Sequence, residues 1–195
     1  MQDIYRDIVE YPELWDAGMQ IYRDSFDVWE REDEEHILEH IRSGIYKMFV
    51  YLQKGEVVGF YILDTNPELS YTLFSFLAIK ESCRGRGLGT KLCLNAIEYF
   101  HNNLPSKWLL IEAQERQARL YAKLGFHRMN LEYLVPAFDS NESIEMSLML
   151  IEKEQKLDKK KLSLIIEDIF SRGYSLDKSD SRIEEQLKRV DKYDI

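Results

Sequence analysis

The segment Arg84-Gly85-Arg86-Gly87-Leu88-Gly89-Thr90 separates an apolar stretch, residues 69–79, from an amphipathic one, residues 88–102. The first stretch is nearly continuous in apolar side chains, as expected of a strand buried on both faces. The second repeats apolar residues three and four positions apart, as in a helix with one buried face. The glycines are therefore predicted to lie in a turn between a strand and a helix.

A turn of this kind is suited to binding an anion. Glycine allows positive φ angles and lets a ligand approach the main chain closely. The first N–H groups of a helix have no partners within the helix, and they lie at the positive end of its dipole. Arg84 and Arg86 add positive charge, and Thr90 adds a hydroxyl donor. We expect a phosphate site here, with an ordinary tight turn as the alternative.

Two common phosphate motifs do not fit the spacing of this turn. A Walker loop requires Lys and then Ser or Thr after its last glycine, whereas Gly89 is followed by Thr90 and Lys91. A dinucleotide fingerprint requires a third glycine at position 90, where Thr90 stands. The turn therefore predicts neither a P-loop nucleotide site nor a dinucleotide site.

Further strands and helices are predicted on both sides of the turn. The strand–turn–helix–strand unit over residues 69–113 implies a parallel crossover, whereas the elements at both ends read as hairpins. The sequence thus predicts an α/β (α+β) protein with a mixed, mostly antiparallel sheet and flanking helices. The other expected strands are residues 3–9, 46–53, 57–63, 126–134 and 143–151, and the other expected helices are residues 14–28, 34–42 and 115–124.

The composition changes after residue 151. Residues 152–195 hold 11 basic and 11 acidic residues, so residues 1–151 carry the whole net charge of −9. Two amphipathic helices are expected, at residues 162–171 and 182–191. We therefore predict a domain over residues 1–151 with a helical C-terminal extension over residues 152–195. An apolar stripe of the extension must be buried against something: Leu162, Ile165, Ile166 and Phe170.

Two motifs resemble signatures of the GNAT superfamily of N-acetyltransferases. Arg84-x-x-Gly87-x-Gly89 is similar to the acetyl-CoA signature of that family, and Tyr121-x-x-x-Gly125-Phe126 is similar to its second signature. The resemblance covers residues 1–151 and leaves the extension outside the family core. It implies a GNAT-type sheet whose two parallel strands, residues 69–79 and 108–113, splay apart to admit the cofactor.

The resemblance also implies which groups hold acetyl-CoA. The backbone of Leu77, Ala78 and Ile79 would pair with the pantetheine arm like an added strand. Backbone amides of the turn would hold the pyrophosphate. These amides belong to Arg84, Gly85, Arg86, Gly87, Leu88, Gly89 and Thr90.

Acetyl transfer to an amine requires a group that takes a proton from the amine and a group that gives one to the thiolate. Tyr121 occupies the position of the family's thiolate-facing tyrosine, so we expect it to be the general acid; packing beneath the next turn is the alternative. Glu112 interrupts an apolar strand, where burial would raise its pKa, so we expect it to be the base. A solvent-facing glutamate and a water relay supported by Ser75 or Tyr133 remain alternatives.

Several charged residues carry weaker signals. Acidic side chains crowd residues 24–35, which in the related fold help to wall the acceptor pocket. They suit a cationic acceptor, and a solvated helix face is the alternative that we favour. His36 and His40 stand one helical turn apart, but no third ligand is evident in the sequence, so we predict no metal site.

The sequence therefore predicts a cytoplasmic enzyme that moves an acetyl group from acetyl-CoA directly to a primary amine of a small molecule, a peptide or a protein. The net charge of −9 argues against nucleic acid and membrane partners, and two cysteines are too few for a disulfide scaffold. A homodimer is compatible with the sequence. The alternative is a non-catalytic acyl-CoA-binding module, a sensor or scaffold that acts through its C-terminal helices.

Overall fold

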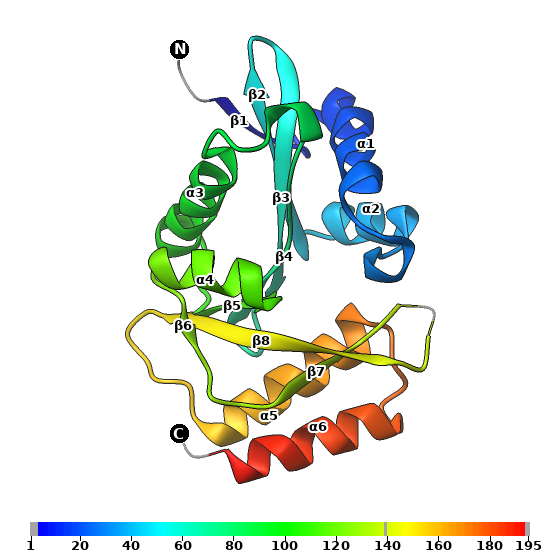
Figure 1. Ribbon diagram of the computed structural model, residues 1–195, viewed down its shortest axis with the longest axis vertical. Coiled ribbons are helices and arrows are strands. Elements are labelled where there is room, and N and C mark those ends of the chain that lie inside the picture. The colour runs from blue at the N-terminus through cyan, green and yellow to red at the C-terminus, as the bar shows by residue number, and fades with distance from the viewer. Residues whose placement is uncertain (1–3, 139, 194–195) are drawn as a thin grey trace.

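The computed structural model describes residues 4–138 and 140–193, which form a mixed sheet with helices on both faces (Figure 1). The strand order is β1-β2-β3-β4-β5-β8-β6, and β7 pairs with β8. Among the described residues, only the β4–β5 pairing is parallel, which confirms the predicted fold class. The strands are β1 (Ile4–Asp7), β2 (Tyr46–Gln53), β3 (Glu56–Asn66), β4 (Tyr71–Ile79), β5 (Trp108–Ala113), β6 (His127–Arg128), β7 (Tyr133–Pro136) and β8 (Ser143–Glu152).

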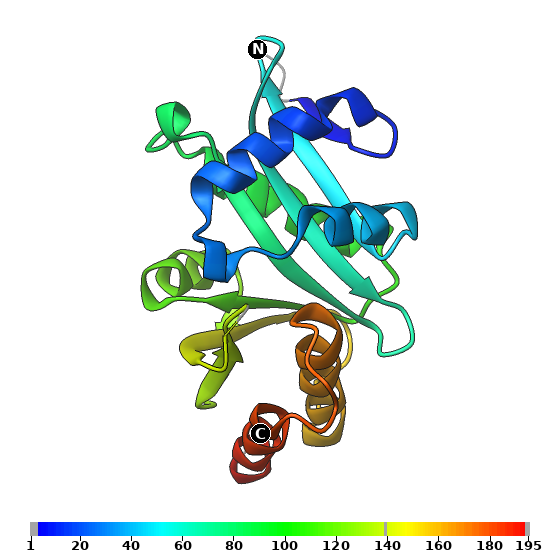
Figure 2. The same ribbon diagram turned by 90° about the vertical axis from the view of Figure 1, so that its right-hand side faces the viewer.

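The helices form layers on the two faces of this sheet (Figures 1 and 2). Helices α1 and α2 cover one face of β2, β3 and β4, whereas α3 covers the opposite face and α4 packs beside β5 and β8. Helices α5 and α6 cover the remaining face of the β5–β8 half. The α-helices are α1 (Trp15–Ser25), α2 (Glu34–Arg42), α3 (Leu88–Asn103), α4 (Glu115–Lys123), α5 (Lys159–Asp168) and α6 (Ser181–Lys192).

The turns follow from local residue choice. Lys54 and Gly55 both have positive φ, 52° and 84°, and they connect β2 and β3 as the predicted hairpin. Such angles match the right-handed twist of the two strands. Asp33 caps α2 by accepting hydrogen bonds from the backbone of Glu35 and His36, at 2.9 and 3.3 Å.

The two parallel strands separate after a short contact. The β4–β5 pairing ends at Leu73 and Leu110, although β4 continues to Ile79 and β5 to Ala113. Opposite β3 the register skips Ser75, so this residue forms a bulge in β4. Because a bulge bends its strand and increases the local twist, it accounts for the divergence of β4 from β5. The splayed strand pair that we predicted is therefore present.

The C-terminal segment packs onto the sheet. The predicted apolar stripe of Leu162, Ile165, Ile166 and Phe170 is fully buried, in one hydrophobic cluster with Trp108 of β5 and with residues of β7 and β8. The buried side chain of Gln186 accepts a hydrogen bond from the Leu134 backbone N–H and donates one to the Glu132 carbonyl, both at 3.0 Å. Residues 152–193 thus share a core with the sheet, and the division at residue 151 stays a prediction.

One predicted strand, residues 126–134, is wrong in its extent. Two short strands, β6 and β7, replace it, and both pair with β8. The chain leaves the extended form between them, where Leu131 packs against the cluster that contains the C-terminal helices. Across residues 4–138 and 140–193, no helix is both long enough and apolar enough to span a lipid bilayer.

Candidate active site

The glycine turn leads directly into α3. Gly85 and Gly87 have φ angles of +76° and +75°, and Gly87 is the N-cap residue of the helix. No side chain caps the helix, and its first turn holds no acidic residue. A Cβ atom added at either glycine would meet nothing within 4 Å. No side-chain cap therefore occupies the first N–H groups of α3, and the phosphate site stays a prediction.

The two arginines of the turn brace it. The Arg84 guanidinium donates to the carbonyl of Ile79 at 3.0 Å and to the hydroxyl of Ser25 at 3.1 Å. The Arg86 guanidinium donates to the carbonyl of Ser82 at 3.1 Å. These contacts tie the turn to β4 and to the end of α1. The arginines add positive charge, while the backbone amides remain the groups best placed for direct contact with a phosphate.

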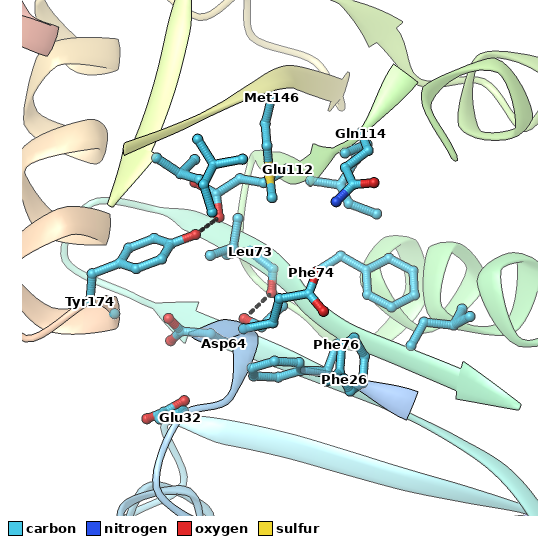
Figure 3. A pocket seen from close by; sticks show the side chains of 18 of the residues that line it. Phe26, Glu32, Asp64, Leu73, Phe74, Phe76, Glu112, Gln114, Met146 and Tyr174 are labelled. Carbon is cyan, nitrogen blue, oxygen red and sulfur yellow. Dashed lines mark hydrogen bonds between the residues drawn. The ribbon is translucent and has the colours of Figure 1, made fainter. Parts of the chain in front are cut away.

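A cavity of about 200 Å³ occupies the gap between the separated ends of β4 and β5 (Figure 3). It is lined by residues 73–77 of β4, residues 111–113 of β5, and side chains from α4, β7, β8 and the C-terminal segment. Glu112 and Tyr121, the predicted base and acid, both line it, as does Leu77 from the predicted pantetheine segment. Ala78 and Ile79 lie beyond it and are buried in the core, and the glycine turn lies outside it.

Glu112 is held inside this cavity by two phenols. The Tyr174 hydroxyl donates to Oε2 at 2.7 Å (Figure 3). The Tyr133 hydroxyl donates to Oε1 at 2.6 Å. Burial raises the pKa of Glu112, and the two hydrogen bonds partly oppose that rise. The surface that Glu112 exposes belongs to the cavity, so it is not the solvent-facing strand-end residue of the alternative interpretation. Its oxygens keep lone pairs that can accept a proton from a bound ligand.

Tyr121 lies on α4 and lines the cavity between the two strands. Its ring packs against Phe126 with centroids 5.8 Å apart, so it also serves the packing role of the alternative interpretation. Within the described residues its hydroxyl has no hydrogen-bond partner. Burial raises the pKa of Tyr121, with a smaller contribution from Cys93. The phenol therefore stays protonated at neutral pH and is available as a donor.

The other ionisable side chains of the cavity wall are also acidic. Besides Glu112, the cavity is lined by Glu30, Glu32 and Asp64, and no lysine, arginine or histidine is among its lining residues. Burial raises the pKa of Asp64 to about 6, although Arg172 lowers it. Burial also raises the pKa of Glu32 to about 8, and Asp64 is paired with Arg172. The cavity wall thus offers several carboxylic groups, whose ionised forms a cationic ligand would favour.

The C-terminal segment contributes side chains to the site that were not predicted from the sequence. Nη1 of Arg172 lies 2.7 Å from Oδ1 of the fully buried Asp64, and the same guanidinium binds Asp168 and the Tyr71 hydroxyl. Asp64 interrupts the apolar strand β3, just as Glu112 interrupts β5. The sequence alone could therefore have marked Asp64 as a candidate site residue. No local pattern marks Arg172 or Tyr174, because their partners lie far away in the sequence.

Comparison with known proteins gives a consistent assignment. The model of the Acetyltransferase (GNAT) family matches residues 15–126, whereas no curated protein matches the chain. A solved structure from Bacteroides thetaiotaomicron, described as a GNAT-family acetyltransferase, has a TM-score of 0.71 at 18% identity and covers 89% of this chain and 99% of that chain. A mutant of the spermidine N-acetyltransferase SpeG from Vibrio cholerae has a TM-score of 0.63 at 16% identity and covers 82% of this chain and 98% of that chain.

These structural likenesses, at such low identity, establish a shared fold. The family model adds the sequence match, because it spans more than half of the chain and includes both the glycine turn and Tyr121. The chain therefore belongs to the GNAT family of acetyltransferases.

Proposed function

We propose that this protein transfers the acetyl group of acetyl-CoA to a primary amine of a small, cationic acceptor. The observation that carries the proposal is the cavity at the splay of β4 and β5, which brings Glu112 and Tyr121 together among further carboxylic groups. GNAT proteins use acetyl-CoA as the acyl donor, and the residues present fit that donor.

The donor would be held mainly by backbone groups. The N–H groups at the start of α3 would bind the pyrophosphate, since they lack helical partners and face open space at Gly85 and Gly87. The edge of β4 from Phe74 to Ile79 has no strand partner on the β5 side among the described residues. That edge, which includes Leu77, Ala78 and Ile79, would pair with the amide groups of the pantetheine arm.

The acceptor would be a small molecule with more than one amino group. The carboxylate of Glu30 in the cavity wall would attract the amine and bind the cationic part that does not react. The backbone N–H of Phe138 donates to the carbonyl of Trp29 at 3.1 Å, and both residues line the cavity. This bond closes part of the rim, which favours a compact acceptor over a protein segment. The spermidine specificity named for SpeG is consistent with this class.

Three proton transfers complete the reaction. Glu112 would take a proton from the acceptor ammonium, directly or through water near Tyr133, and the neutral amine would then attack the thioester carbonyl. Tyr121 would donate its phenolic proton to the departing sulfur, and the second proton of the attacking nitrogen would pass through water to the tyrosinate, which restores the phenol. A raised pKa suits both roles, because it makes Glu112 a stronger base and keeps Tyr121 protonated.

The cytoplasm is the expected compartment, and Cys83 and Cys93 are both free thiols.

The experiment is an assay of CoA release with a panel of amines. Polyamines and diamines should be acetylated faster than neutral monoamines, and amino acids with acidic side chains should react slowest. Acetyl-CoA binding, seen as a raised melting temperature, without CoA release for any amine would support the non-catalytic acyl-CoA sensor instead. Acetylation of peptides alone would contradict the small-molecule acceptor.

Tyr121→Phe tests the role of the acid within the same assay. We expect kcat to fall by about 10²–10⁴-fold, the usual contribution of a positioned proton donor, while the Kd for acetyl-CoA changes little. The control is Tyr99→Phe, since Tyr99 lies on α3 and does not line the cavity. Equal turnover in the two variants would remove Tyr121 from the mechanism.

A further inference from the structure

Three side chains, one just before α2 and two on it, converge on one point. Nδ1 of His36 lies 3.0 Å from Oε1 of Glu32, and Nδ1 of His40 lies 3.8 Å from the same oxygen. A ligand atom of each of the three residues lies within 4.8 Å of the others. From the sequence we predicted no metal site, because no third ligand was evident for the two histidines. Glu32 supplies that partner.

Two buried atoms in this group lack hydrogen-bond partners. Among the described residues, neither Oε1 of Glu32 nor Nδ1 of His40 forms a hydrogen bond, and only 4% of the Glu32 side chain is exposed. The second oxygen of Glu32 accepts a hydrogen bond from Tyr46 at 2.8 Å, so only Oε1 is left open. A buried polar atom without a partner is unfavourable, and a bound cation would satisfy both atoms at once.

Two of the three separations between ligand atoms suit a tetrahedral metal ion, and all three are within 4.8 Å. Ligand atoms that bind Zn²⁺ with bonds of about 2.0–2.1 Å lie about 3.3 Å apart in a tetrahedron. The separations of 3.0 and 3.8 Å from Oε1 of Glu32 fall on either side of that value. Two imidazoles and one carboxylate form a known ligand set for zinc and leave a fourth position for water. We propose that Glu32, His36 and His40 bind a divalent transition-metal ion of the Zn²⁺ type.

The local structure holds the three ligands in place. His36 and His40 stand four residues apart on α2, so they share one face of the helix. Asp33 caps the helix, and the Tyr22 hydroxyl donates to the Glu32 backbone carbonyl at 3.0 Å, which fixes Glu32 just before the cap. The His36 side chain is 33% exposed, which gives an ion a route to the buried carboxylate.

The ion would brace one wall of the cavity. Glu32 lines the cavity together with Trp29 and Glu30, and Figure 3 shows it on the far side of Asp64 from Glu112. A metal ion bound to Glu32, His36 and His40 would connect α2 to the segment that precedes it. This role does not depend on acetyl transfer, because the ligands are separate from Glu112, Tyr121 and the glycine turn.

The test uses the full chain without an affinity tag, stripped of metal with a chelator and titrated with ZnCl₂. Calorimetry should show one Zn²⁺ bound per chain, and Zn²⁺, but not Mg²⁺, should raise the melting temperature. Glu32→Gln, His36→Gln and His40→Gln should each weaken binding by more than about 100-fold, since even loss of a group that only orients a ligand weakens binding by about 10–100-fold.

The controls are His101→Gln and His127→Gln, which alter the two histidines outside the cluster and should bind Zn²⁺ like the unaltered protein. Circular dichroism checks that each variant is folded. If Glu32→Gln does not fold, His36→Gln and His40→Gln decide whether the cluster binds Zn²⁺. Failure of the unaltered protein to bind Zn²⁺ would overturn the proposal and leave a histidine–carboxylate ion pair. Equal weakening in the control variants would also overturn it.

Discussion

The glycine turn and the cavity between β4 and β5 are built in opposite ways. The turn is one continuous run of seven residues, Arg84 to Thr90, whose exposed backbone offers N–H groups. The cavity is built from buried side chains of at least five elements, brought together by β3, β4, β5, β7 and the C-terminal segment. A site made of backbone groups is therefore encoded in one short stretch of sequence. A site made of side chains forms only when distant segments come together in the folded protein.

Glu112→Gln, a substitution in the cavity, is expected to have the largest effect, a loss of catalytic rate. The rate of acetyl transfer should fall by about 10²–10⁴-fold, as for the loss of a general base. Burial raises the pKa of Glu112, and the reaction needs its deprotonated form, so the rate of the unaltered enzyme should fall as the pH drops through that raised pKa. The variant should lose this step in its pH–rate profile.

The matched control for Glu112→Gln is Glu115→Gln. Glu115 is an exposed residue of α4 that pairs with Arg119 and Arg128. Its substitution should leave both the rate and the pH profile nearly unchanged. If Glu112→Gln kept the profile of the unaltered enzyme, the assignment of the base would be wrong.

Arg172→Ala should destabilise the cavity region without altering the turn. Removing the guanidinium leaves the buried carboxylate of Asp64 without its cation, which should lower the free energy of unfolding by about 3–5 kcal/mol. Lower pH should reduce this loss, because a protonated Asp64 needs no cationic partner. Chemical denaturation measures the change.

Arg128→Ala is the control, since its pair with Glu115 is exposed to solvent and should contribute little to stability. Similar losses in both variants would mean that the Arg172–Asp64 pair is no stronger than a surface ion pair. The Kd for acetyl-CoA should be unchanged in folded Arg172→Ala, since the turn lies outside this network.

Tyr174→Phe should reduce stability less than Arg172→Ala, and it should shift the pH–rate profile in one direction. The loss of one hydrogen bond to a charged group should lower the free energy of unfolding by about 1.5–3 kcal/mol. Because this bond lowers the pKa of Glu112, its loss should raise that pKa and move the acidic limb of the pH–rate profile to higher pH. Tyr193→Phe, in a tyrosine that does not line the cavity, is the control. A limb that moved to lower pH would contradict the assignment.

Gly87→Ala should cause the smallest loss of stability, and it alters the glycine turn alone. A non-glycine residue at φ +75° is strained by about 1–2 kcal/mol. Gly55→Ala is matched to it, because Gly55 has φ +84° and equally open space in the β2–β3 turn. Both variants should lose similar stability in denaturation experiments, but only Gly87→Ala should raise the KM for acetyl-CoA. Equal KM values would argue against the turn as the donor site.

The sequence predicted the parts of the site that are encoded within a few residues. The glycine turn, the helix after it and the parallel strand pair are confirmed as structure, and Glu112 was singled out because it interrupts an apolar strand. The catalytic roles of Glu112 and Tyr121 stay predictions. Tyr174 and Arg172 were missed because they contact residues 62 and 108 positions away, and no periodicity or motif encodes such a contact.

The position of Tyr174 in the chain has a consequence for protein synthesis. The glycine turn and Glu112 leave the ribosome well before Tyr174, which follows Glu112 by 62 residues. A nascent chain therefore contains the turn proposed to hold the acyl donor before Glu112 can receive its second phenol. The order of translation thus places the proposed donor site ahead of the completed surroundings of the proposed base.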